Sequence, residues 1–274
     1  QGLPAELSER KQRMDAARKL FARYNQAGIT GITDVVHNTE DIKVYQKLGE
    51  SEHLTVRVYM DYQPAKPEHP SETEELAQSI PYRTGKGDIS IRMGPYKTVV
   101  DGGILTGTAC MRDPWGQYAA ELFGSGTPDS RGTAFYSEEE LSEIVRITAE
   151  HGWSFTAHVT GDAALEMLLR AYSRLHSRTT IHERRFSAIH ANFIPHDLAA
   201  LCRQMSILLD MQPAWLYKDA DAMIEILGRD RMKTFHPYRN MLQAGVRICA
   251  GSDQMVKLDP RKSVNPFAPF IGIH

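Results

Sequence analysis

Two histidines, an aspartate and a lysine are the side chains of this sequence best placed to hold a metal ion. His158 and His190 each end a short run of apolar residues. Asp253 follows another such run after Gly-Ser, and Lys97 lies inside a fourth. Neutral imidazoles and a carboxylate are typical ligands of zinc and similar divalent metals. A lysine ammonium is a poor ligand, but carboxylation by carbon dioxide would make Lys97 an anionic oxygen ligand.

Each of these residues also has a purely structural interpretation. A histidine at the end of a strand is often a hydrogen-bonded core residue, and this applies to both His158 and His190. Asp253 could cap the turn after Gly-Ser, and Lys97 could extend its ammonium from the rim of the fold to solvent. Asp162 is expected to cap the helix that follows His158. The shared placement near strand ends is stronger evidence for a metal centre than any single residue.

Short apolar runs alternate with helical patterns along the chain and predict a parallel sheet. The runs cover residues 31–36, 54–59, 96–100, 154–158, 186–190, 207–211 and 246–250. Their near-continuous apolar character suits strands that are buried on both faces. No glycine-rich dinucleotide fingerprint follows them, so a closed barrel is favoured over an open doubly wound sheet. We therefore predict a single α/β domain over residues 1–274, an incomplete (β/α)8 TIM-like barrel with one strand fewer than eight.

Helical patterns between the runs support this alternation. Ser137 and Glu140 form a capping-box pattern ahead of an apolar stripe that ends at Gly152. Further stripes lie near the amino terminus and in residues 165–175, 198–202 and 237–245. Residues 102–136 have no such period, and a segment of this length is expected to be a lid, a binding loop or disordered. Because it follows a predicted strand, it should lie at the carboxyl face of the barrel.

Composition and charge exclude several classes of function. The chain carries 32 Lys+Arg and 34 Asp+Glu, a formal net charge of -2, so no nucleic-acid partner is expected. No apolar run approaches the roughly 20 residues of a membrane span, so no membrane association is expected. The three cysteines are widely spaced, which argues against a disulfide framework and favours the reducing cytoplasm. The expected partner is a small-molecule substrate.

The segments around the candidate ligands resemble the metal-dependent amidohydrolase superfamily, in the branch called amidohydrolase family 3. Residues 157–164, Ala-His-Val-Thr-Gly-Asp-Ala-Ala, are similar to its signature of His, two residues, Gly-Asp and Ala. Residues 97–102, Lys-Thr-Val-Val-Asp-Gly, resemble its strand-four segment, and residues 189–192 resemble its strand-six histidine segment. Residues 212–215, 236–238, 244–246 and 251–253 continue the match in the family's order. The resemblance covers the chain from about Gly28 to Asp253.

Two departures from the family pattern bear on the metal site. Ile189 and Asn192 stand where the family usually has Glu and Gln around the strand-six histidine, which removes an outer partner of the site. The strand-one His-x-His pair of the family occurs nowhere in the sequence. The resemblance thus implies an internal piece of a longer enzyme, with about strands two to eight of the barrel. Free strand edges near Val35 and Val246 would favour formation of a homo-oligomer.

The resemblance implies a metal-dependent hydrolase that acts on carbon–nitrogen bonds other than peptide bonds, in amide-, formamide- or urea-like substrates. It assigns Lys97, His158 and His190 to one metal position, with Lys97 carboxylated. The family's other metal position retains only Lys97 and Asp253, so at most one well-held divalent metal, zinc, is expected. Asp253 would accept a proton from the attacking water and pass it to the leaving nitrogen.

Two other interpretations remain open. One is a non-catalytic barrel that lacks a complete metal site, which the missing His-x-His pair favours. The other is a phosphate-binding barrel, which predicts a glycine-rich turn after one of the last two strands. Residues 251–252, Gly-Ser, are the candidate for that turn, although Asp253 beside them would repel a phosphate. Trp115, Tyr118, Phe123 and Arg131 of the long loop could contact substrate or pack the loop onto the barrel.

Overall fold

The computed structural model describes residues 5–51, 53–65, 69–124, 127–254, 261 and 265–273. The strands are β1 (Gly31–Val36), β2 (Arg57–Tyr62), β3 (Ile91–Val99), β4 (Phe155–Val159), β5 (Ser187–His190), β6 (Leu208–Met211) and β7 (Arg247–Ala250). The helices are α1 (Ala5–Gln26), α2 (Thr39–Gly49), α3 (Pro70–Ser79), α4 (Gln117–Phe123), α5 (Glu138–Glu150), α6 (Asp162–His176), α7 (His196–Gln204), α8 (Pro213–Arg231), α9 (Tyr238–Gln243) and α10 (Pro269–Ile273). Two short 3-10 turns are η1 (Ile104–Thr106) and η2 (Met232–Thr234).

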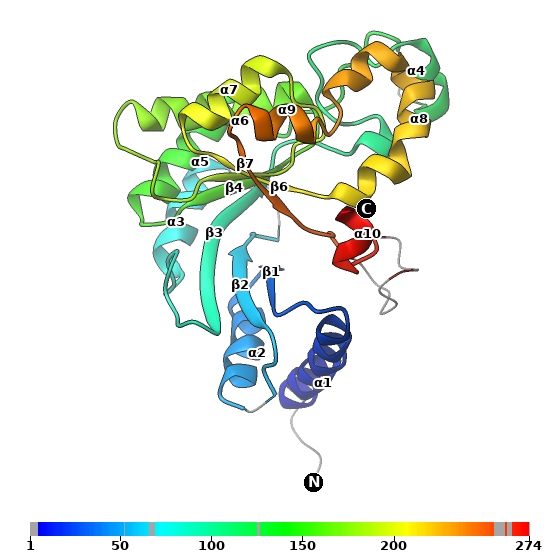
Figure 1. Cartoon of the computed structure of the whole chain (residues 1–274). Helices are drawn as coiled ribbons and strands as arrows, with labels where there is room; N and C mark the ends of the chain where they lie inside the picture. The colour runs from blue at the N-terminus through cyan, green and yellow to red at the C-terminus, as the bar shows by residue number, and fades with distance from the viewer. Residues whose placement is uncertain are drawn as a thin grey trace.

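The strands of the described residues form one parallel sheet in chain order, from β1 at one edge to β7 at the other. The sheet curls, and helices α5, α6, α7 and α9 lie along the outside of its later strands (Figure 1). Each crossover therefore returns the chain to the same end of the sheet, as in a barrel built of repeated strand–helix units. The prediction of an incomplete (β/α)8 barrel is confirmed.

The observed strands agree with the predicted runs except in β2 and β3. The predicted run 54–59 is displaced, because β2 begins at Arg57, and β3 begins five residues before the predicted start at Tyr96. Gly94 and Pro95 interrupt the apolar pattern in the first half of β3. Their pairing with β2 is irregular: Met60 pairs with Met93 and Tyr62 with Tyr96, so two residues of β3 oppose one of β2. Such a bulge accommodates a proline, which has no N–H to donate to the ladder.

The main core lies between the sheet and the outer helices. The predicted capping box begins α5: Glu140 N–H donates to Ser137 Oγ at 3.1 Å, and Ser137 N–H donates to Glu140 Oε2 at 2.8 Å. Its apolar stripe and that of α6 pack against each other, and both are fully buried at most positions. Trp153, which is 0% exposed, packs against the rings of Tyr62 and Tyr96. These contacts make the outer layer a rigid support for the strand ends.

The described part of the long segment after β3 is packed, which excludes disorder among the three predicted alternatives. It contains η1 and α4, and its apolar side chains form a second core with residues of α8 and with two phenylalanines. Figure 1 shows α4 beside α8 at the end of the sheet where the later helices lie. Trp115 is 2% exposed and donates from Nε1 to the carbonyl of Ala109 at 3.0 Å, so it packs the loop. Tyr118 is about half exposed.

The open sheet leaves β1 and β7 as its two edges in the described part of the chain. Unpaired backbone groups at an edge strand are templates for pairing with another chain. We therefore expect the apparent mass in sedimentation to rise with protein concentration. The variants Val35→Lys and Ile248→Lys, at half-buried positions of the two edges, should be less associated. Leu242→Lys, at an exposed position of α9, is the control; a monodisperse monomer in the unmodified protein would contradict the expectation.

None of the helices formed by the described residues has the length and the apolar character that crossing a membrane requires.

Candidate metal centre

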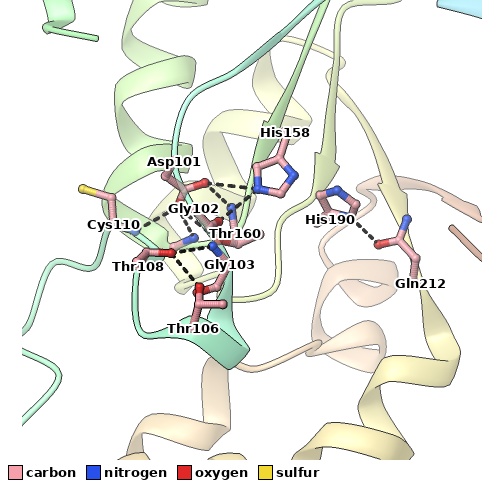
Figure 2. A network of polar contacts seen from close by, with 11 residues as sticks. Asp101, Gly102, Gly103, Thr106, Thr108, Cys110, His158, Thr160, His190 and Gln212 are labelled. Atoms are coloured by element: carbon pink, nitrogen blue, oxygen red, sulfur yellow. Dashed lines mark hydrogen bonds and ion pairs between the residues drawn. The ribbon is translucent and has the colours of Figure 1, made fainter. Parts of the chain in front are cut away.

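The carboxyl ends of β4 and β5 bring His158 and His190 together. The strands are parallel neighbours, and their register pairs His158 with Ile189 and Val159 with His190. The two imidazole rings meet edge to face, with centroids 4.6 Å apart and an angle of 73° between their planes. Figure 2 shows His158 between the turn at Asp101 and Gly102 on one side and His190 on the other. The predicted convergence of these two strand ends is therefore present in the structure.

Hydrogen bonds define which nitrogen of each ring is free. His158 Nε2 lies 3.0 Å from the carbonyl oxygen of Gly102, which can only accept, so Nε2 carries the proton and Nδ1 does not. His190 Nδ1 lies 2.8 Å from Gln212 Oε1 and donates to it. The amide group of Gln212 has this orientation because its Nε2 donates to the Asp210 carbonyl at 3.2 Å. Each ring thus keeps one unprotonated nitrogen, and metal ligation requires such a nitrogen.

Burial keeps both imidazoles neutral. His190 is 5% exposed, and burial lowers its pKa well below the ordinary value, with a further contribution from nearby His158. Trp215 of α8 stacks on the His190 ring at a centroid distance of 5.0 Å. Burial also lowers the pKa of His158, against the hydrogen bond to Gly102. Neutral imidazoles bind divalent metals without first losing a proton.

Gln212 is a residue of this site to which sequence reasoning assigned no role. The family pattern places a carboxylate beside the strand-six histidine, and Ile189 stands there in this chain. The structure instead supplies an amide oxygen from the residue directly after β6. The sequence offered one signal for this role: Gln212 lies between the end of a predicted strand and the first residue of a helix. The ring of His190 therefore has an orienting partner that is neutral.

Lys97 and Asp253 border the same cavity as His190. The cavity has a volume of about 940 Å³ and lies inside the curled sheet, where residues of β1, β2, β3, β6 and β7 line it. Burial lowers the pKa of Lys97, and the carboxylates of Asp61, Asp253 and Asp34 oppose this shift. Burial raises the pKa of Asp253, and its backbone φ of 48° lies in the left-handed region, which aspartate tolerates better than most residues. The charges of Lys97 and Asp253 both act on the pKa of His158.

Three further carboxylates line this cavity, and sequence reasoning missed them. Asp34, Asp61 and Asp210 each interrupt an apolar strand, which was the available signal. Burial raises the pKa of each of the three. Asp61 is 2% exposed, and its Oδ1 has no hydrogen-bond partner among the described residues. A Cβ on Gly94 would lie 2.5 Å from that oxygen, so the glycine of β3 makes room for the Asp61 carboxylate.

The donor set fits one metal position of the kind predicted, provided that Lys97 takes part. Among the residues that the structure describes, no three His, Cys, Asp or Glu side chains lie together so that they could hold a metal ion. Asp253 therefore does not complete a three-ligand set with the two histidines. The free nitrogens of His158 and His190 would supply two ligands, and an oxygen from carboxylated Lys97 would be the third. Three protein ligands with one open position are typical of catalytic zinc.

A second buried histidine lies next to this site. His236 is 2% exposed; its Nε2 is 2.9 Å from Asn192 Nδ2, and its Nδ1 is 3.3 Å from the Tyr238 hydroxyl. Burial lowers the pKa of His236 to about 4. As the pH falls below about 6.5, the ordinary pKa of histidine, the unfolded chain therefore binds a proton before the folded protein does. The free energy of unfolding should fall by about 3 kcal/mol between that pH and the folded pKa.

The variant His236→Gln should lack this part of the pH dependence, because glutamine does not titrate. Urea unfolding of both proteins at a series of pH values would measure the difference in slope. His196→Gln makes the same change at an exposed histidine and is the matched control. Equal pH dependence in the unmodified chain and in His236→Gln would contradict the prediction.

Comparison with known proteins identifies the family. A family model described as "Amidohydrolase family" matches residues 2–271, and the chain belongs to this family. The Bacillus subtilis (strain 168) protein named "Putative amidohydrolase YtcJ" is 27% identical over 183 residues, which are 67% of this chain and 31% of YtcJ. The Arabidopsis thaliana protein LONG AFTER FAR-RED 3 is 25% identical over 175 residues, 64% of this chain and 28% of that protein. The chain spans under a third of the length of these relatives.

Solved structures with the same fold include two from archaea. An uncharacterized metal-dependent hydrolase from Pyrococcus horikoshii has a TM-score of 0.72 and 17% sequence identity, with 92% of this chain and 45% of that chain covered. Another uncharacterized metal-dependent hydrolase, from Pyrococcus furiosus, has a TM-score of 0.71 and 17% sequence identity, with 100% of this chain and 50% of that chain covered. These similarities support the barrel fold. The family resemblance of the sequence motifs is confirmed by the family match.

Proposed function

We propose that this chain carries the metal-binding part of a hydrolase that acts on carbon–nitrogen bonds other than peptide bonds. The observation that carries the proposal is the pair of neutral histidines at the ends of β4 and β5, each with one nitrogen held by an oxygen acceptor. This outer hydrogen bond is typical of histidines that ligate metals. Family membership supports the same chemistry. The proposed substrates are small molecules with an amide, formamide or urea group.

The proposed metal is zinc, held by His158, His190 and carboxylated Lys97, with Asp253 beside it. Carboxylation forms a bond between Lys97 Nζ and the carbon of carbon dioxide, and the nitrogen gives up a proton. Burial of Lys97 favours the uncharged amine that this reaction needs. When bound, the metal lowers the pKa of a coordinated water toward neutrality and polarises the substrate carbonyl.

Asp253 is the proposed proton carrier of the reaction. It borders the cavity and lies near enough to His158 and Lys97 to influence the pKa of both. Burial raises the pKa of its carboxyl group above the ordinary value, which makes the carboxylate a stronger proton acceptor. It would take a proton from the attacking water and deliver it to the leaving nitrogen. The Asp253 carbonyl accepts a hydrogen bond from Asn265 Nδ2 at 2.5 Å, which fixes the backbone at this position.

The alternative function is that of a non-catalytic barrel. It is favoured by the absence, in the described residues, of three His, Cys, Asp or Glu side chains arranged for a metal. A phosphate-binding barrel has less support, because the cavity lining mixes several carboxylates with Arg57, Arg92 and Arg185 and is not predominantly basic. The three free cysteines suit the reducing cytoplasm, where we propose that the protein acts.

Hydrolysis by zinc-loaded protein tests the proposed function. Release of amine or ammonia would be measured with a panel of formamides, amides and ureas, before and after removal of metal with a chelator. We expect turnover of at least one class, loss of turnover with the chelator, and recovery when zinc is restored. Zinc bound without turnover of any class would support the non-catalytic barrel instead.

A further inference from the structure

The Asp101 carboxylate is fully buried and accepts hydrogen bonds from three backbone N–H groups. Its Oδ2 accepts from Cys110 N–H and from Gly161 N–H, each at 2.8 Å, and its Oδ1 accepts from Thr160 N–H at 2.9 Å. The Thr160 hydroxyl donates to Oδ2 at 3.1 Å. Figure 2 shows this carboxylate beside the His158 ring. Sequence reasoning included Asp101 in a family motif and gave it no role.

These bonds join three segments around His158. Asp101 follows β3, Thr160 and Gly161 follow β4, and Cys110 belongs to the long loop. The Cys110 carbonyl in turn accepts from the N–H groups of Ala163 and Ala164, at 3.1 and 3.2 Å, in the first turn of α6. A Cβ on Gly161 would lie 1.9 Å from the Cys110 carbonyl oxygen, which shows how closely the two segments approach. The turn after His158 is therefore held from both sides.

The same turn determines the surroundings of His158 Nε2. The carbonyl of Gly102, directly after Asp101, accepts from His158 Nε2 at 3.0 Å and from the Thr160 hydroxyl at 2.6 Å. Asp101 Oδ1 itself lies 3.8 Å from His158 Nε2. Two oxygen acceptors on one side of the ring favour the tautomer with a proton on Nε2. That tautomer leaves Nδ1 free.

We propose that Asp101 is a positioning residue that, together with the adjacent Gly102 carbonyl, selects the Nε2–H tautomer of His158 and thereby presents Nδ1 as the metal ligand. The ligand role of Nδ1 rests on the proposed function, whereas the tautomer is a property of the metal-free protein. A carboxylate accepts at both oxygens and donates at neither, so it has no group that could stabilise the opposite tautomer. Its negative charge also favours a ring whose N–H points toward it.

The variant Asp101→Asn tests this proposal with little change in shape. Asn can keep the bonds from Cys110 and Gly161 with its oxygen. Its NH₂ group then lies on the side of His158 Nε2, and the bond from Thr160 N–H is lost. A donor at that position opposes a proton on Nε2, while the Gly102 carbonyl still accepts from it, so the preference for the Nε2–H form should weaken. Nitrogen NMR of histidine-labelled, metal-free protein reports the tautomer of each ring. We expect the Nε2–H form of His158 in the unmodified protein and a mixture of the Nε2–H and Nδ1–H forms in the variant, with His190 unchanged.

Zinc affinity, measured by titration calorimetry, is the second readout. Loss of an outer partner typically lowers metal affinity by about 10- to 100-fold, and we expect a decrease of this size for Asp101→Asn. Thr160→Val is the matched control, because it removes the hydroxyl contacts with Asp101 and with the Gly102 carbonyl and leaves both oxygen acceptors beside His158 in place. It should destabilise the turn and retain the Nε2–H tautomer.

Several results would overturn the proposal. One is a folded Asp101→Asn variant with an unchanged His158 tautomer; another is an equally large tautomer change in Thr160→Val, which would show that loosening of the turn is sufficient. If Asp101→Asn does not fold, the His158 tautomer of the unmodified protein still tests the proposal, because a proton on His158 Nδ1 is incompatible with the proposed role. Absence of zinc binding in the unmodified protein would reject the ligand role of His158 Nδ1. The tautomer measurement would then test only the effect of Asp101 on the His158 ring.

Discussion

Replacement of His158 or His190 with alanine is expected to abolish tight zinc binding. Each variant removes one of the two imidazoles whose rings lie 4.6 Å apart, and no third histidine is in contact with both in the described residues. Loss of an outer partner already costs about 10- to 100-fold in affinity, so loss of a ligand itself should cost at least about 100-fold, or about 2.7 kcal/mol. Elemental analysis and titration calorimetry would measure the bound metal and its affinity.

A second histidine pair provides a matched control. The rings of His176 and His182 are also 4.6 Å apart, at an angle of 84°, but they lie at the far end of α6 and in the following loop. Both are partly exposed. The double variant His176→Ala/His182→Ala should bind about one zinc ion per chain, like the unmodified protein. If all variants bind as much zinc as the unmodified protein, the metal lies elsewhere; if none binds zinc, including the unmodified chain, the catalytic proposal fails.

Replacement of Asp253 with asparagine should separate metal binding from hydrolysis. The change removes the proton acceptor, keeps the shape, and leaves the backbone bond to Asn265 intact. General acid–base catalysis contributes typically 10²- to 10⁴-fold, so we expect kcat to fall by about this factor. Zinc content should stay near that of the unmodified protein, because Lys97, His158 and His190 would hold the ion.

The kinetic measurement uses the best substrate of the hydrolysis screen. Asp113→Asn makes the same chemical change at an exposed position of the long loop and should leave kcat unchanged. Loss of zinc in Asp253→Asn would assign Asp253 to the metal rather than to proton transfer. Full activity in a zinc-loaded Asp253→Asn variant would exclude Asp253 as the proton carrier.

Much of the sheet could be predicted from local patterns. The first strand was predicted with its observed bounds, 31–36, and the last four to within one residue, because buried parallel strands are short apolar runs between polar turns. The helix α8 was not predicted, although it spans 19 residues. Gly228 interrupts it with a φ of 77°, and much of its surface is exposed, so its apolar residues form no regular stripe. The structure of the loop after β3 could not be predicted either, because its apolar side chains pack against segments that are distant in the sequence.

Sequence by itself determined the types and order of the residues at the strand ends. His158 and His190 were identifiable because they are the penultimate residue of β4 and the last residue of β5, and parallel strands deliver their carboxyl ends to the same rim. The motifs around them were also sufficient for the family, which the family match confirms. All of these features are local or depend only on the alternation of strands and helices.

Only the tertiary structure decided which nitrogen of each histidine is free and which carboxylates share the cavity. Gln212 reaches His190 from the end of β6, and the turn at Asp101 reaches His158 from the end of the neighbouring strand β3. Hydrogen bonds of this kind form only when the donor and acceptor atoms lie about 3 Å apart, which depends on the direction of each side chain. Sequence spacing specifies only the strand to which a residue belongs. Packing of the long loop against α6 and α8 sets these directions, and no local pattern encodes it.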